Sequence, residues 1–242
     1  MRGILNFVNR YKNAEVNLLI GQGRVKVFLS SDWLLVSKIF KVPADLTKEY
    51  EEKRYPVLTL PFQEFYRRIA DKNELAGEFG NILERCLPVE NFKLRGYDAV
   101  HEDICFGIKP SELKRELFFL RPFARGEREN VIHFRFSGID CSLMTFGIAK
   151  GKVLSFGLRK IILPGIEMKT EAEQDRCLSL DLLYDFLRLL DPKQYVFFSF
   201  GGERELVTIS QDEEEWTMNL APVRFWTNTH KEVFDAFLKI SG

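Results

Sequence analysis

The amino-acid sequence predicts an α+β fold of antiparallel sheets, because short amphipathic helices alternate with groups of strand-like runs along its 242 residues. The pattern is clearest between Arg176 and Arg224, where one helix is followed by three extended runs separated by tight turns. The same order of elements recurs three times upstream of Arg176. We therefore predict four units of one type, paired into two domains.

The first two units precede residue 95 and are less complete than the later ones. The first begins directly with a helix and lacks a leading strand, and its Gly21-Gln-Gly23 segment indicates a hairpin turn. The second opens with a short strand that runs into a helix. The elements predicted here are a helix over 2–12, strands over 16–20, 25–29, 33–42 and 56–60, a helix over 61–71, and extended runs near 79–83 and 92–94.

The last two units contain longer apolar runs with sharper ends. In the third, Lys109-Pro110-Ser111 opens a helix with either a serine cap or a proline at its first position, and Pro122 closes it. In the fourth, Asp191-Pro192 ends the helix and Gly201-Gly202 separates two strands. The elements predicted here are strands over 104–108, 131–136, 139–148, 153–163, 177–180, 195–200, 205–210 and 216–220, and helices over 109–121 and 181–190.

Polar segments of low hydrophobicity give the domain boundaries. The stretch 95–103 lies between the two pairs of units and is predicted to be an interdomain linker, so that the domains span 1–94 and 104–226. Residues 227–242 are predicted to form an added helix, whose apolar side contains Val233, Phe234, Phe237 and Leu238.

Charge and composition restrict the possible partners. Thirty-five basic and 35 acidic residues leave no net charge, so the chain has no bulk electrostatic attraction for nucleic acid, and any such contact must come from local basic faces. A hydrophobic fraction of 45% with 22 phenylalanines predicts globular domains with aromatic-rich cores.

Cysteine usage and the absence of targeting signals predict an intracellular protein. Four cysteines, Cys86, Cys105, Cys141 and Cys177, lie far apart in or beside apolar runs, which favours buried free thiols over disulfides or metal ligands. The N-terminus lacks the features of a signal peptide, and no apolar run approaches the about 18 residues of a membrane span. We expect a cytoplasmic protein (at the nucleoid) or a nuclear one, neither secreted nor bound to a membrane.

The final unit resembles the final unit of the DNA sliding clamps. The relevant stretch, which is about a fifth of the chain, is LSLDLLYDFLRLLDPKQYVFFSFGGERELVTISQDEEEWTMNLAPVRF. Its Leu-Ala-Pro at 220–222 is similar to the end of the eukaryotic and archaeal clamps, and its Pro-Val-Arg at 222–224 to the end of the bacterial β clamp. The resemblance implies two clamp-like domains, the first shortened, each with two helices on one face of continuous antiparallel sheets.

The same resemblance implies a function without bond-making chemistry. Clamps encircle duplex DNA and tether a polymerase or another DNA enzyme, and two domains per chain imply a homotrimeric ring, or a place in a heteromeric one. Basic side chains on the helices would then contact phosphates without reading sequence. The candidate DNA-binding residues are Arg2, Arg10, Arg67, Arg68, Lys72, Lys114, Arg115 and Arg121.

The fourth helix departs from that expectation. Asp181, Asp185 and Arg188 share one stripe, so this helix presents a net acidic face, whereas the polar faces of the other three lean basic. A solvated helix face explains all of these charges equally well. The shortened first domain also leaves open whether a ring closes, because clamp rings close by pairing of edge strands between subunits.

Clamp partners dock as short peptides in an apolar groove beneath the linker, beside the final strand. Carried over by position, this groove would be lined by Leu94, Tyr97, Val100, Ile104, Ala221, Pro222 and Val223. The alternative is that these are ordinary core and loop residues. A further hypothesis is that the added C-terminal helix covers this groove.

No motif indicates catalysis, a cofactor or a metal site. The three histidines, His101, His133 and His230, have no ligand neighbours at metal-binding spacing, and no general acid–base or nucleophile arrangement stands out. We therefore predict a clamp-like processivity or tethering factor and not an enzyme. The alternatives are a clamp-fold protein–protein adaptor, a clamp-loader or checkpoint-type subunit that does not encircle DNA, and an unrelated α+β protein.

Overall fold

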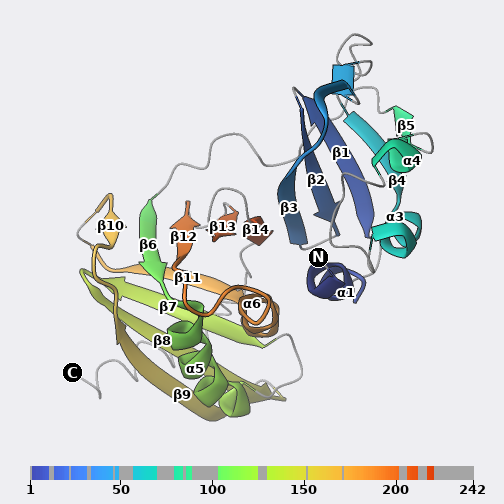
Figure 1. Ribbon diagram of the computed structural model, residues 1–242. Coiled ribbons are helices and arrows are strands. Elements are labelled where there is room, and N and C mark those ends of the chain that lie inside the picture. Colours follow the sequence, from blue (N-terminus) through green and yellow to red (C-terminus); the bar gives the residue numbers. More distant parts are fainter. Residues whose placement is uncertain are drawn as a thin grey trace.

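The computed structural model describes most of the chain (Figure 1). The described residues are 2–10, 14–21, 23–31, 34–45, 47–48, 57–69, 79–83, 86–88, 103–124, 130–150, 152–170, 172–201, 206–211 and 217–220. Most of the predicted linker and the whole predicted C-terminal helix lie outside them, so the domain boundaries stay a prediction.

The elements follow the predicted order. In the first half they are α1 Arg2–Val8, β1 Glu15–Gly21, β2 Arg24–Ser30, β3 Leu34–Lys41, β4 Val57–Pro61, α3 Phe62–Ile69, α4 Phe79–Leu83 and β5 Leu87–Pro88. In the second half they are β6 Ile104–Ile108, α5 Pro110–Leu120, the 3-10 turn η1 Arg121–Phe123, β7 Val131–Ser137, β8 Asp140–Ala149, β9 Lys152–Ile162, β10 Glu167–Met168, β11 Gln174–Ser179, α6 Leu180–Leu187, β12 Val196–Phe200, β13 Val207–Ser210 and β14 Thr217–Leu220.

Local sequence signals explain several boundaries. Gly23 has a φ of +67°, a left-handed conformation that glycine adopts without strain, and it closes the β1–β2 hairpin. Helix α5 starts with Pro110 at its first position, while the Ser111 hydroxyl donates to the Pro192 carbonyl and does not cap the helix. Helix α6 is capped by the Ser179 hydroxyl, which accepts a hydrogen bond from the Leu182 N–H at 3.4 Å.

Two antiparallel sheets result. The long sheet has ten strands in the order β10-β6-β12-β13-β14-β3-β2-β1-β4-β5, and it joins both halves of the chain where β14 pairs with β3. The short sheet has the order β11-β7-β8-β9. The leading strand of each later unit therefore pairs with the meander of the other unit: β6 joins β12–β14, and β11 joins β7–β9.

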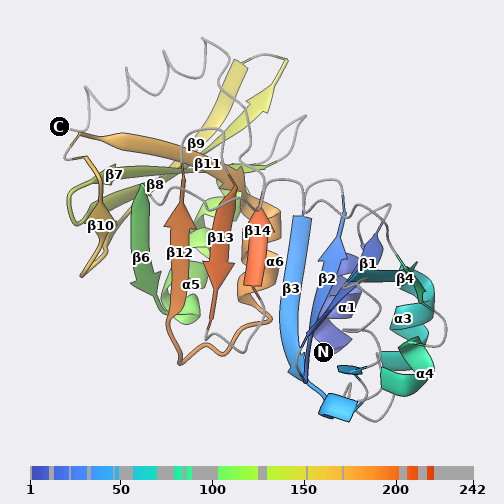
Figure 2. The same ribbon diagram turned by 90° about the horizontal axis from the view of Figure 1, so that it is seen from above.

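Helices α5, α6, α1 and α3 lie on one side of the long sheet, as Figure 2 shows from left to right. One large core of buried apolar side chains extends across both halves, and Met144 and Phe146 form a small separate cluster. Its centre is a phenylalanine cluster that joins the two sheets: Phe106 stacks on Phe198 at 4.9 Å between ring centroids and lies 5.7 Å from Phe136 of the short sheet. The expectation of an aromatic-rich core and of the α+β fold is confirmed.

Some expectations need correction or stay open. Residues 79–83, predicted as an extended run, form the short helix α4, because Phe79, Ile82 and Leu83 fit a helical face as well as a strand. The four cysteines are free as predicted, with Cys141 and Cys177 buried and Cys86 and Cys105 partly so. Among the described helices none is long and apolar enough to cross a membrane. The run predicted at 92–94 lies outside the described residues.

Candidate nucleic-acid interface

Four helices form a continuous row in the order α5, α6, α1, α3. Between α6 and α1, Phe186 and Phe7 pack with ring centroids 6.3 Å apart. Between α1 and α3, the Tyr66 hydroxyl donates to the Asn6 side-chain carbonyl, and the Gln63 amide donates to Asn9 at 2.9 Å. Helix α5 in turn contacts α6, so packed side chains and polar bridges hold the four helices together.

The row contains most of the predicted DNA-binding residues. Arg67 on α3 and Arg115 on α5 are exposed, and Arg68 and Lys114 are half-buried beside them. Neither Arg67 nor Lys114 makes an ion pair with another residue in the described ranges. Arg68 lies 3.7 Å from Glu64, one helical turn away. Lys72 and the side chain of Arg2 lie outside the part of the chain that the structure describes.

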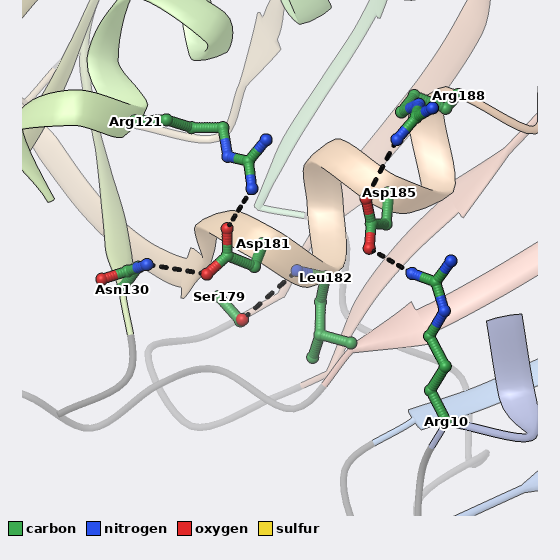
Figure 3. Close-up of polar contacts among 8 residues, drawn as sticks. All are labelled: Arg10, Arg121, Asn130, Ser179, Asp181, Leu182, Asp185 and Arg188. Carbon is green, nitrogen blue, oxygen red and sulfur yellow. Dashed lines mark hydrogen bonds and ion pairs between the residues drawn. The ribbon is translucent and has the colours of Figure 1, made fainter. Parts of the chain in front are cut away.

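The acidic face of α6 is neutralised by two of the predicted DNA-binding arginines (Figure 3). Arg10, two residues after the end of α1, donates to Asp185 at 2.7 Å, and Arg121 in η1 donates to Asp181 at 3.1 Å. Arg188 lies 3.9 Å from the other oxygen of Asp185. The carboxylates of α6 therefore tie this helix to its neighbours on both sides, and the stripe that looks acidic in the sequence has arginine partners in the fold.

Two more contacts fix the Asp181 end of this arrangement. The Asn130 amide donates to the second oxygen of Asp181 at 2.7 Å, and the Arg121 guanidinium lies 4.6 Å from the centre of the Tyr184 ring. A DNA phosphate would have to compete with these partners for Arg121. It would meet no such competitor at Arg67 or Lys114 among the described side chains.

Arg115 belongs to a second ion-pair cluster, which no pattern in the sequence predicted. Glu116 is buried on the inner side of α5 and accepts hydrogen bonds from Arg159 of β9 at 2.6 Å and from Arg115 at 2.9 Å. Burial by itself would raise the pKa of the Glu116 carboxyl, but the hydrogen bonds and charges of the two arginines outweigh it and lower that pKa below its usual value. The available signal was a glutamate inside the apolar stripe of Leu113 and Leu117.

The end of the predicted linker is held by a buried arginine. Asp103 lies 3.1 Å from the Lys169 ammonium and 3.6 Å from the Arg176 guanidinium. Arg176 is buried and donates two hydrogen bonds to the Gly201 carbonyl, at 2.8 and 3.0 Å. This cluster fixes where the linker enters the second half of the chain.

Only one of the predicted partner-groove residues can be placed. Ile104 starts β6 and is fully buried in the core, so its side chain supports the long sheet from within. The others, Leu94, Tyr97, Val100, Ala221, Pro222 and Val223, lie outside the described residues, and the groove stays a prediction. No group of histidine, cysteine or acidic side chains that could hold a metal ion occurs among the described residues.

This architecture is that of the DNA sliding clamps. The structure is similar to a DNA polymerase sliding clamp from Bacillus subtilis, with a TM-score of 0.66 at 14% identity over 93% of this chain and 62% of that one. It is similar to a DnaN sliding clamp from Pseudomonas aeruginosa bound to griselimycin, with a TM-score of 0.62 at 10% identity over 93% of this chain and 64% of that one.

A third similar structure matches along almost its whole length. This is PCNA from Thermococcus kodakaraensis, with a TM-score of 0.58 at 13% identity over 92% of this chain and 95% of that one. By contrast, the chain covers less than two thirds of the length of the two bacterial clamps. Neither a protein-family model nor a curated protein matches the sequence. The predicted resemblance is confirmed at the level of fold: the protein has the DNA sliding-clamp fold.

Proposed function

We propose that the protein is a non-enzymatic, clamp-like tethering factor that contacts duplex DNA with the helix row α5–α6–α1–α3. The observation that supports this most directly is the row itself, because it carries basic residues from both halves of the chain on helices along one side of the long sheet. Arg67 and Lys114 stand at its two flanks, on α3 and α5, and have no ion-pair partner in the described ranges. Contacts of this kind bind phosphates without reading sequence.

Assembly would use the free edge of the short sheet. Strand β9 has eleven residues and lies at the edge of the short sheet. Among the described strands only β8 pairs with it, and its side chains Leu154 and Ile162 are exposed. Phe119 and Phe123, at the end of α5 and in η1, are exposed nearby. Long exposed edges with apolar side chains pair with other chains. We infer that β9 is a subunit contact of a ring or partial ring, homotrimeric or heteromeric.

Partners would include a DNA polymerase or another clamp-binding protein, docked at the predicted groove. A protein with this function works where DNA is, at a nucleoid or in a nucleus. We propose the two domains at 1–94 and 104–226, joined by the linker at 95–103 and followed by the helix at 227–242, as the units of this assembly.

A protein–protein adaptor on the same fold is the second candidate. It is favoured by the pairing of Arg10 and Arg121 with α6, which uses two of the basic side chains that DNA would need. An adaptor would retain the fold and assembly but would not bind DNA. The two candidates therefore differ in one measurable property.

The deciding experiment is a charge reversal on the helix row. Arg67→Glu combined with Lys114→Glu should weaken binding to a short duplex at least tenfold, and should make the affinity less dependent on salt. The matched control is Arg24→Glu with Lys41→Glu, an exposed pair opposite each other on β2 and β3, outside the helices. Equal losses in both variants, or no duplex binding by the unaltered protein, would favour the adaptor.

A further inference from the structure

The short sheet has a second apolar face, directed away from the helices. Helices α5 and α6 and the turn η1 pack on one face, where Leu120 and Phe123 meet Gly157. Cross-strand partners point to the same side of a sheet. The register therefore assigns the following residues to the opposite side, which we call the outer face: Cys177, His133, Met144, Leu158, Phe146 and Phe156.

The centre of the outer face is buried although the described helices all lie elsewhere, while Leu158 and Phe156 on β9 are partly buried. Met144 has no exposed surface, and only 4% of His133 and 8% of Phe146 is exposed. In an uncovered sheet, neighbouring strands shield the flanks of such side chains but leave their tips in water. These values hold for a single copy of the chain, so no partner chain is needed to bury these side chains.

We propose that the C-terminal segment 227–240 docks as an amphipathic helix on the outer face of the short sheet. Its apolar residues, Val233, Phe234, Phe237 and Leu238, recur at helical spacing and need an apolar surface to cover them. Fourteen helical residues extend over about 21 Å, which matches several strands lying about 4.8 Å apart.

Reach and chemistry agree with this placement. The last described strand ends at Leu220, and the six residues before 227 can span about 20 Å, twice the about 10 Å between packed layers. The outer face offers a thioether at Met144 and rings at Phe146 and Phe156, which suit the phenylalanines of the segment. Among the stretches of chain outside the described residues, this one combines such a stripe with sufficient length.

This docking does not depend on DNA binding or on ring assembly. It differs from the hypothesis that the segment covers the partner groove, because the outer face lies on the short sheet, whereas the groove was placed beside the final strand of the long one.

Thiol chemistry offers a local reporter. Cys177 lies on the outer face, with its sulfur 3.0 Å from the Nδ1 atom of His133. Cys141 is buried on the other face of the sheet, the one that the helices cover, where Phe136 is its cross-strand partner. A background with Cys86→Ser and Cys105→Ser leaves these two thiols to report on the two faces. Removing the cover should expose Cys177 and leave Cys141 shielded.

The test compares two variants of the full chain in that background. Phe234→Ser with Phe237→Ser removes the apolar anchors, and the control Glu232→Ser with Lys239→Ser alters the polar side without changing the net charge. Maleimide modification at each cysteine is followed by peptide mass spectrometry. The anchor variant should label Cys177 at least tenfold faster, with Cys141 unchanged and the control equal to the parent.

Two results would overturn the proposal. An unchanged rate at Cys177 would mean that another segment covers the outer face, and the partner groove would become the better site for residues 227–240. Equal acceleration at Cys177 and Cys141 would mean that the whole domain had loosened, which an uncovered face alone does not cause.

Discussion

Replacing Asp181 and Asp185 with asparagine should strengthen binding to duplex DNA, because these carboxylates hold Arg121 and Arg10 in the place where phosphates would bind. Both pairs are accessible to solvent: the exposed side-chain fraction is 62% for Arg10 and 42% for Arg121. Ion pairs of this kind stabilise a fold by at most about 1 kcal/mol each. The double substitution should therefore leave the protein folded and release two guanidinium groups.

The size of the effect follows from counterion release. Each additional phosphate contact steepens the dependence of log K on log salt concentration by about 0.9. At about 0.1 M salt one such contact corresponds to about eightfold in affinity, and two correspond to about sixtyfold as an upper limit. The loss of two negative charges near the phosphates acts in the same direction.

Fluorescence anisotropy with a labelled duplex between about 50 and 200 mM salt measures both affinity and slope. The control Asp140→Asn with Glu167→Gln removes the same charge from exposed positions on β8 and β10, away from the helix row. If the control gains as much affinity as the α6 variant, or if the slope of the α6 variant is unchanged, Arg10 and Arg121 do not become phosphate ligands.

Three further predictions concern stability and assembly. Glu116→Gln should cost about 2 kcal/mol at pH 7, since it weakens charged hydrogen bonds. The pKa of this carboxyl is lowered in the fold, so its stabilisation is present at neutral pH and is lost progressively as pH falls below the unfolded value of about 4.3. The difference between the two proteins in urea unfolding should therefore be smaller at pH 3 than at pH 7. Gly157→Ala should lower the melting temperature by a few degrees, since the new methyl carbon would lie 2.8 Å from a methyl carbon of the buried Leu120. The control Gly21→Ala should not lower it in this way, because its new methyl carbon would meet no atom within 4 Å. Leu154→Glu should lower the mass measured by light scattering if β9 joins subunits, while Phe197→Glu, exposed on β12, should not; an equal effect of both would contradict the assignment of this edge.

Local patterns predicted most elements because each depends on neighbours in sequence. Alternating apolar residues indicated β7 to β9, and Pro110 and Pro122 marked the two ends of α5 and its 3-10 extension. The short run at 79–83 was assigned wrongly as extended, since five residues do not distinguish a helical face from a strand. Length, not composition, limited that prediction.

The candidate site was predicted only in part, because a list of charged residues does not contain their partners. Asp185 and Arg10 are 175 positions apart, and no spacing rule connects them. The sequence showed α6 as an acidic helix that opposed DNA binding, and packing of α6 against α1 and η1 turned the same carboxylates into ties between helices. Glu116 and Arg176 likewise gained their roles only through burial.

The sequence by itself determined the repeated unit, its order of helix and strands, and the free cysteines, two of them buried, because these follow from periodicity, turn residues and hydrophobicity. The tertiary structure decided how the units combine. Each later unit gives its leading strand to the meander of the other, and β14 joins β3 to make one sheet of both halves. Strand pairing between distant segments depends on backbone hydrogen bonds that every residue except proline can form, so it leaves no local mark in the sequence.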